Sequence, residues 1–513
     1  MKFKSLARIF TIFIVLMLAV YPYAGVSSHS EEFIPLWGPY LTFVSETGIT
    51  INWKTEGETQ GLVRYATDSY YQHHGNYSDV VSDPPAQLHH VQLGGLSPDT
   101  KYHYQLQVQG EYTNDATFTT LGNESFTFIV YGDSQEQTPM FTQLERHKIV
   151  ADRIAAEEDI SFVLHAGDLV SDGDDLEEWG RFFEAVRQML SEIPVYPVLG
   201  NHEDNSSNYF DAFNVEPWYS FDCGNAHFAM LDSNLSIAVQ TEWLAEDLDS
   251  GADWKFAVYH HPPYSSSPKN WGGWLHTRTA WEPLFIENDV NAVFSGHVHA
   301  YERYWENGIH YAVLGTGGGP CYQLEEAKIA GYRNSLEYTL GYARVTVNGD
   351  EAFMDIIKVA DISPENGDVL YIYPPNTIFE RVNLQPEPFA AEASLTVTSR
   401  VVLPSVGIVV EPDAIDYGDV SHGESSDIEV VNLTNTGTLD VDVTLEIDGI
   451  DTVAQNFFEQ SLYIDGSPHH VASIIASIES QQSVDIDTQL HVSEDWKETG
   501  VQEALFIFWA EAL

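Results

Sequence analysis

Phe126-Thr-Phe-Ile-Val-Tyr-Gly-Asp133 is the stretch that decides the fold of this chain. Its first six residues are mostly apolar, β-branched or aromatic, which predicts a strand buried on both faces. The same order of an apolar run, a turn and a polar side chain recurs four more times. The other runs are 160–165 before Asp168, 195–199 before Asn201, 254–259 before His260, and 290–294 before His297.

Helix-like stretches alternate with these runs, at 140–157, 176–192, 240–248 and 280–287. Alternation of strand and helix predicts an α/β core. In such sheets, ligands bind beyond the carboxyl ends of the strands. We therefore expect the five polar loops to converge on one rim of the sheet.

The loops carry oxygen and imidazole donors, in the motifs Gly132-Asp133, Gly167-Asp168, Gly200-Asn-His-Glu203, His260-His-Pro-Pro263 and Gly296-His-Val-His299. This mix suits a pair of hard or borderline metal ions, and paired ions are a common device for attacking phosphate esters. A single Gly-Asp pair is equally well explained as a turn. Turns alone do not explain five such motifs in this order, so the set predicts a metal centre.

The arrangement resembles the calcineurin-like metallophosphoesterases, and within them the purple acid phosphatase branch. The closest match is Gly296-His-Val-His-Ala-Tyr-Glu-Arg303, together with a β-domain in front of the catalytic domain. The resemblance covers about residues 36 to 359. It implies an α/β metallophosphoesterase core of β-sheets flanked by helices.

The resemblance also implies a site with two metal ions. It assigns Asp133 and His299 to the first ion, Asp168 to both ions, and Asn201, His260 and His297 to the second ion. A hydroxide that bridges the ions would attack phosphorus in line. His202 would lie over the phosphate and stabilise its charge or protonate the leaving oxygen. His276 is a further candidate for a catalytic contact with substrate, and a solvent-exposed loop histidine is the alternative.

Two positions depart from the family pattern. Ser171 stands where purple acid phosphatases have the tyrosine that binds iron(III) and gives the colour. Gln135 stands where other branches have a histidine. We therefore expect a colourless protein with two divalent ions, such as zinc, manganese or iron. The first ion would be bound weakly, or its site completed by water or Gln135.

The chain is strongly acidic, with 77 Asp and Glu residues against 22 Lys and Arg residues and a formal net charge of −55. Nucleic-acid binding relies on clustered basic residues, so this balance argues against a nucleic acid as partner. Both a saline habitat and an ordinary acidic secreted protein fit the charge.

Residues 1–28 have a basic start and an apolar stretch of about a dozen residues, which is typical of a secretory signal peptide. We expect a secreted or extracellular protein, or one anchored to the cell surface if the signal is not cleaved. In an exported protein, Cys223 and Cys321 form either one disulfide or two buried thiols.

Flanking segments predict a multidomain chain. Residues 33–121 resemble an all-β fibronectin type III sandwich, residues 124–360 form the catalytic domain, residues 361–399 are a linker or extended brace, and residues 400–513 resemble an all-β immunoglobulin-like sandwich. The first sandwich is either a structural spacer or a module for sugars or proteins, and the last has an adhesive or spacing role. Cell-surface or carbohydrate contacts would run through these sandwiches.

The function predicted from these features is an exported, metal-dependent phosphomonoesterase, similar to acid phosphatases, that acts on a small phosphate ester. A phosphodiesterase or nucleotidase on the same dinuclear core is the alternative, because the pocket decides specificity. A non-catalytic cell-surface binding protein is the third possibility, and the intact ligand set argues against it.

Overall fold

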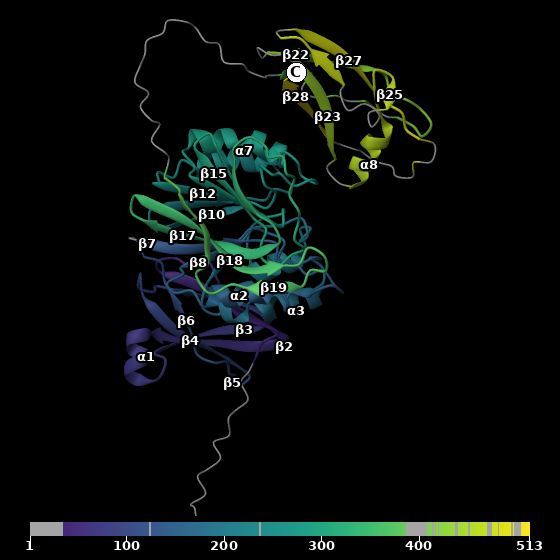
Figure 1. The fold of residues 1–513 in the computed structure, drawn as a ribbon. Helices are drawn as coiled ribbons and strands as arrows, with labels where there is room; N and C mark the ends of the chain where they lie inside the picture. The colour runs from purple at the N-terminus through teal and green to yellow at the C-terminus, as the bar shows by residue number, and fades with distance from the viewer. Residues whose placement is uncertain are drawn as a thin grey trace, which may run out of the picture. The chain divides into compact units, whose positions relative to one another are not determined.

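The computed structural model describes residues 34–385, apart from 123–124 and 235–236, and residues 408–512 with several short gaps. The chain divides into two compact units, Met1–Ala391 and Glu392–Leu513 (Figure 1). The predicted signal segment lies outside the described residues, as does the end of the predicted linker from residue 386 on. Within the described part of the chain, no helix is both long and apolar enough to cross a membrane.

The first unit begins with an N-terminal β domain. Its elements are β1 (Trp37–Thr42), β2 (Gly48–Thr67), α1 (Asp68–His74), β3 (Asp79–Gly94), β4 (Lys101–Val108), β5 (Glu111–Tyr112) and β6 (Ala116–Thr119). Strand β2 pairs antiparallel with β1, β3 and β4. The buried Trp53 stacks on His89 at a ring distance of 4.4 Å inside this domain.

The first core sheet contains both parallel and antiparallel strands. Its strands are β7 (Ser125–Tyr131), β8 (Phe162–His165), β9 (Val195–Pro197), β17 (Thr339–Asn348), β18 (Glu351–Ile362), β19 (Val369–Ile372) and β20 (Ile378–Asn383). Strands β7, β8 and β9 are parallel neighbours. At the far side β9 pairs with β1 through Thr42 and Val195, so one sheet runs from the core into the N-terminal β domain.

The second core sheet has its own set of parallel strands. It consists of β10 (Tyr219–Cys223), β11 (Ala226–Met230), β12 (Trp254–Val258), β13 (Ala292–Ser295), β14 (Tyr301–Glu306), β15 (Ile309–Leu314) and β16 (Tyr332–Leu336). Strands β11, β12, β13 and β15 are parallel, and the two edges are antiparallel.

The two core sheets pack face to face, and helices cover their outer faces. Along β7 the side chains alternate, as strand geometry requires. Phe128 contacts Phe228 and Phe256 of the second sheet at ring distances of 5.2 and 5.4 Å, whereas Ile129 belongs to the cluster under the helices. The helices are α2 (His147–Ala155), α3 (Leu176–Ala185), α4 (Arg187–Leu190), α5 (Ser207–Phe213), α6 (Ile237–Asp247) and α7 (Leu275–Glu287). This four-layer arrangement explains why β7 is apolar on both faces.

The stretch 361–399, predicted as a linker or an extended brace, contributes two strands. Strands β19 and β20 both pair with β18. Up to residue 385 the chain is therefore part of the core sheet, and its Pro- and Asn-rich turns lie between strands.

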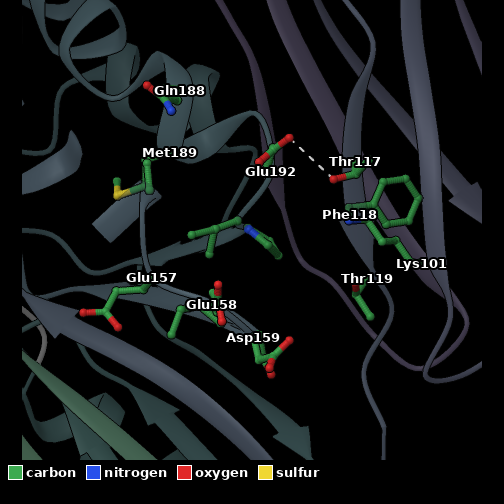
Figure 2. Close-up of a pocket in the computed structure, with 15 residues that line it drawn as sticks. Lys101, Thr117, Phe118, Thr119, Glu157, Glu158, Asp159, Gln188, Met189 and Glu192 are labelled. Atoms are coloured by element: carbon green, nitrogen blue, oxygen red, sulfur yellow. Dashed lines mark hydrogen bonds between the residues drawn. The ribbon is translucent and has the colours of Figure 1, made fainter. Parts of the chain in front are cut away.

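A cavity of about 350 Å³ lies where the N-terminal β domain meets the core. Figure 2 shows that Thr117 and Lys101 line one side, and Glu192 and Glu158 belong to the other. None of the six predicted metal ligands lines this cavity, so the predicted chemistry belongs to another part of the unit.

The second unit is rich in β-structure. Its elements are β21 (Ile408–Glu411), β22 (Glu429–Asn435), β23 (Val441–Gly449), α8 (Thr452–Ser461), β24 (Leu462–Ile464), β25 (Ser467–Pro468), β26 (Ala476–Ile478), β27 (Ser483–Leu490) and β28 (Ala504–Ala512). They form two sheets, ordered β21-β22-β27-β24-β25 and β26-β23-β28, that share one apolar cluster.

Candidate metal centre

The structure brings the six predicted metal ligands together. They are Asp133, Asp168, Asn201, His260, His297 and His299. The loops that carry them follow β7, β8 and β9 of the first core sheet, and β12 and β13 of the second. The sequence predicted that the loops converge, and they do. It also predicted that they lie on one rim of a single sheet, which is wrong. The ligands come instead from two sheets packed face to face, because the parallel strands divide between them.

The backbone at three of these residues is left-handed, which is uncommon for residues other than glycine. The φ angles are 59° at Asp133, 54° at Asp168 and 67° at His297. Strained backbone of this kind persists where the surroundings fix it, and it often occurs at functional sites. Gly167 also has a positive φ, and a Cβ there would lie 2.7 Å from Nδ1 of His260. The glycine before Asp168 is therefore required by its close approach to His260.

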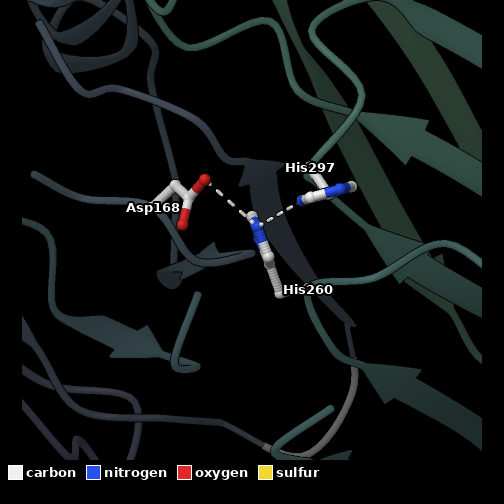
Figure 3. A group of neighbouring side chains, drawn as sticks. All are labelled: Asp168, His260 and His297. Atoms are coloured by element: carbon white, nitrogen blue, oxygen red, sulfur yellow. Dashed lines mark hydrogen bonds and ion pairs between the residues drawn. The ribbon is translucent and has the colours of Figure 1, made fainter. Parts of the chain in front are cut away.

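One group of donors contains Asp168, His260 and His297 (Figure 3). Nε2 of His260 lies 3.2 Å from Oδ2 of Asp168 and 3.3 Å from Nδ1 of His297. The amide oxygen of Asn201 lies 3.1 Å from Nε2 of His260 and 2.9 Å from Nδ1 of His297. Four donors thus face one another around a single point.

A second group of donors contains Asp133, Asp168 and His299, all buried. Nε2 of His299 lies 3.1 Å from Oδ1 of Asp133. The carboxylate of Asp168 belongs to both groups. A carboxylate has two oxygens, so it can hold two ions side by side.

The imidazole rings of His260 and His299 are oriented as metal ligands usually are. A metal-bound histidine usually donates its other ring N–H to a fixed acceptor. Nδ1 of His260 donates to the carbonyl of Ala166 at 2.8 Å, and Nδ1 of His299 donates to the carbonyl of Pro320 at 2.6 Å. The Nε2 atoms of both rings then point into the donor groups, where an ion would take the place of any proton on them. The residues present therefore fit a pair of metal ions.

The charges in the cluster favour a cation. Burial disfavours charge on both Asp168 and His260, but the interaction between these two residues is stronger. The charge and hydrogen bond of His260 lower the pKa of Asp168, and Asp168 raises the pKa of His260 to about 9. Burial and the neighbouring His260 lower the pKa of His297 to about 3, which keeps this ring neutral and able to bind a metal.

His202 lies at the open side of the cluster, with 41% of its side chain exposed. Its Nδ1 donates to the carbonyl of Ser171 at 2.8 Å, and its Nε2 lies 3.9 Å from Oδ2 of Asp168. The ring therefore presents Nε2 near the cluster. Its contact with Oδ1 of Asp168 runs through the backbone N–H, at 3.0 Å.

His276 stands in the first turn of α7 and is half-buried. Its ring lies 5.8 Å from that of Trp274, and the ring of Trp274 lies 5.3 Å from that of His297. The link that can be traced from His276 to the cluster therefore runs through Trp274. The catalytic role of His276 stays a prediction.

Glu203 is a functional residue whose role the sequence did not reveal. It is fully buried and accepts hydrogen bonds from the backbone N–H groups of Asp168, Leu169, Val170 and Gly200. Burial, and then the charge of Asp168, raise the pKa of Glu203 to about 7. Glu203 ties two ligand loops together. The motif Gly200-Asn-His-Glu203 contained this signal, but only the fold shows which backbone groups the carboxylate reaches.

Both cysteines are free thiols in the structure. Burial raises the pKa of Cys223 to about 12 and that of Cys321 to about 11. A thiol whose pKa is raised is a poor nucleophile near neutral pH, so neither cysteine supports a cysteine-based mechanism.

Comparison with known proteins identifies two domains. Residues 126–301 match the model of the calcineurin-like phosphoesterases, and residues 37–120 match that of the purple acid phosphatase N-terminal domain. Purple acid phosphatase 21 of Arabidopsis thaliana is 28% identical over 266 residues, which are 45% of this chain and 58% of the relative. Phosphoenolpyruvate phosphatase of Allium cepa is 27% identical over 258 residues, which are 44% of this chain and 52% of the relative.

Solved structures show the same fold. A purple acid phosphatase from yellow lupin (Lupinus luteus) seeds superposes with a TM-score of 0.56 at 16% identity, over 66% of this chain and 74% of that chain. The structure of PhoD superposes with a TM-score of 0.53 at 13% identity, over 70% of this chain and 94% of that chain. The chain therefore carries a calcineurin-like phosphoesterase domain preceded by a purple acid phosphatase N-terminal domain.

Proposed function

We propose that this protein is an exported, metal-dependent phosphoesterase that hydrolyses small phosphomonoesters. The observation that carries the proposal is the pair of donor groups that share the carboxylate of Asp168. Two ions held side by side through a shared carboxylate would suit attack on a phosphate ester. The names of the relatives, which include purple acid phosphatases and a phosphoenolpyruvate phosphatase, favour a monoester as substrate.

The ligand set is the one predicted from the sequence: Asp133, Asp168, Asn201, His260, His297 and His299. When bound, the two ions would supply a water that is activated near neutral pH and positive charge against the phosphoryl oxygens. The carboxylates of Asp133 and Asp168 make the cluster attractive to cations. The phenolate ligand of a ferric site has no counterpart at Ser171, which favours two divalent ions.

His202 is proposed to act on the substrate itself. Its Nδ1–H is held by the carbonyl of Ser171, so Nε2 is the atom left for the substrate. In its protonated form, Nε2–H would donate to a phosphoryl oxygen or pass its proton to the leaving oxygen. The partial exposure of the ring leaves room for an ester to approach.

The flanking β domains are proposed to be spacers, of the fibronectin type III kind at the N-terminus and of the immunoglobulin kind at the C-terminus. Contacts with the core support a bracing role for the first. The hydroxyl of Tyr40 donates to the carbonyl of Ala212 at 2.6 Å, and that of Tyr104 donates to the carbonyl of Ser191 at 2.7 Å. Export is proposed from the character of residues 1–28.

Hydrolysis of p-nitrophenyl phosphate tests the proposal. The full-length mature chain is stripped of metal and assayed with added manganese, zinc or iron. We expect turnover that depends on the ion and that disappears with a chelator. Bis-p-nitrophenyl phosphate serves as the diester comparison. Preference for the diester would contradict the monoester assignment, and no turnover of either ester with any ion would contradict the phosphoesterase.

Asp168→Asn tests the shared carboxylate. The substitution keeps the shape of the side chain but removes its charge, so we expect both ions and all turnover to be lost. Asp172→Asn, the same change at an exposed residue four positions later, is the matched control and should keep both. Metal content is measured by mass spectrometry beside the assay. Normal turnover in Asp168→Asn would exclude the bridging role.

A further inference from the structure

Gln135 lies beside the donor group that contains Asp133, Asp168 and His299, in the loop that follows β7. Its side chain is buried, with 3% of the residue exposed. Nε2 of Gln135 lies 3.1 Å from Oδ2 of Asp168 and 3.2 Å from Nε2 of His299. The amide therefore reaches two side chains that would both hold the first ion.

The two atoms near this amide group, Oδ2 of Asp168 and Nε2 of His299, both face its nitrogen. Nδ1 of His299 donates to the carbonyl of Pro320, so in the neutral ring the lone pair is on Nε2. Oδ2 of Asp168 is a carboxylate oxygen. The N–H bonds of Gln135 satisfy both lone pairs, and so take the place that a cation would have between the same atoms.

The other end of the amide is left without a partner. Oε1 of Gln135 is buried, and it accepts no hydrogen bond within the described part of the chain. Buried carbonyl oxygens are almost always paired, because desolvation without a partner is costly. No hydrogen bond holds the oxygen in its position. Since the terminal torsion of glutamine has nearly two-fold symmetry, a half-turn exchanges oxygen and nitrogen.

We propose that Gln135 is a ligand of the first metal ion, through its amide oxygen. The proposal rests on the dinuclear centre proposed above. With the half-turn, Oε1 takes the position of Nε2 between Asp168 and His299, and the oxygen is satisfied by the ion.

Ser171 cannot fill this role as the chain is folded. Its hydroxyl lies 2.8 Å from the carbonyl of Glu136, to which it donates, and 2.6 Å from Oε1 of Glu178. Both partners lie outside the donor groups. A neutral oxygen from Gln135 then replaces the charged phenolate of the related phosphatases. Such a ligand suits hard divalent ions such as manganese.

Metal content and metal-dependent melting of the full-length protein test the assignment without reference to turnover. Gln135→Ala removes the ligand oxygen. We expect wild type to keep two manganese ions per chain after dialysis, and Gln135→Ala to keep one, with affinity at the first site at least about tenfold lower. Loss of a residue that merely orients a ligand already costs about 10- to 100-fold.

Gln135→Glu keeps the expected oxygen and adds a charge. It places a third carboxylate beside Asp133 and Asp168, so we expect the metal-free variant to melt below metal-free wild type. Two manganese ions should bind and raise its melting temperature by more than they raise that of wild type, because binding stabilises the folded state. This variant keeps the test available if Gln135→Ala does not fold.

Gln143→Ala is the matched control. Gln143 is also a buried glutamine whose Oε1 accepts no hydrogen bond from the described residues, but its Nε2 donates to the carbonyls of Ser134 and Leu169 rather than to a candidate ligand. We expect this variant to be less stable but to keep two ions.

Three results would each overturn the proposal. They are two tightly bound ions in Gln135→Ala, equal losses of metal in both alanine variants, and failure of Gln135→Glu to bind the first ion. A wild-type chain that binds two ions but hydrolyses nothing would refute the phosphoesterase and leave the ligand assignment standing.

Discussion

A substitution of His202 can distinguish a loss of catalysis from a loss of metal binding. Only its backbone N–H touches Asp168 within hydrogen-bonding distance, whereas its ring extends toward the open side. We expect His202→Ala to keep both ions and to lower kcat by about a hundredfold, the typical effect of losing a general acid or charge-stabilising group. Steady-state assays and metal analysis on the same sample measure this.

Variants of two further histidines serve as a control and as a comparison for His202→Ala. His73→Ala, on the exposed surface of α1, should behave like wild type. His276→Ala tests the other predicted catalytic histidine, and an effect on KM would show that it contacts substrate. If His202→Ala loses an ion, His202 is part of the metal centre and its assignment to the substrate is wrong.

The residues that touch the proposed ions were predictable, but those that hold them in place were not. An apolar run that ends in Gly-Asp or Gly-His-x-His marks Asp133 and His299 directly. Glu203 acts through contacts with the loop of Asp168, which is more than 30 residues away in sequence. For Gln135, the family pattern marked the position as a candidate to complete the first site, but its contact with His299, 164 residues away, could not be read from the sequence. No local pattern encodes such contacts, since they depend on how the strand ends meet.

At the level of elements, the periodicity of the sequence predicted where strands lie, but not which strands pair with each other. The run 126–131 was predicted as a strand with both faces buried, and β7 has that environment. The helix expected over 140–157 is shorter, since α2 covers His147–Ala155 and turns precede it. The pairing of β1 with β9 could not be predicted, because it joins segments about 150 residues apart through a single residue pair.

His227 links two strands of the second core sheet, β10 and β11, to helix α6. From β11, its Nδ1 lies 2.8 Å from Oδ1 of Asp222 on β10, and its Nε2 lies 2.9 Å from Oδ2 of Asp247 on α6. Burial disfavours a charge on the ring, but the hydrogen bonds with Asp247 and Asp222 outweigh it and raise the pKa of His227. The charged ring can donate from both nitrogens, so protonation strengthens the link.

The raised pKa makes stability depend on pH in a definite direction. Below about pH 6.5, the ordinary histidine value, the ring is protonated in both the folded and the unfolded chain, and its contribution is complete. As pH rises from there through the raised folded value, this contribution is lost. We therefore expect the melting temperature of wild type to fall relative to that of His227→Gln over this window. Parallel melting curves at every pH would show that His227 does not titrate as described.

For the whole molecule, the continuous sheet and the shared ligand centre make the first unit one structural body. Strands β7, β8 and β9 carry ligand loops, and the same sheet continues through β1 into the N-terminal β domain. Movement of that domain relative to the core would therefore strain the sheet that positions Asp133 and Asp168. This connection gives the first β domain a structural reason to accompany the catalytic core.

The net charge of −55 predicts how the whole molecule responds to salt. Self-repulsion destabilises a compact chain, and mobile ions screen it over a Debye length that falls from about 30 Å at 0.01 M to about 10 Å at 0.1 M and about 3 Å at 1 M. We expect the melting temperature of the metal-free protein to rise with sodium chloride, most steeply below about 0.5 M. At about pH 4, where roughly half of the exposed carboxylates are neutral, the rise in melting temperature should be much smaller.

A melting temperature that does not change with salt at pH 7 would mean that the acidic groups are too dispersed to repel one another. A steep rise that continues through several molar would indicate a protein adapted to high salt, because simple screening is nearly complete at 1 M.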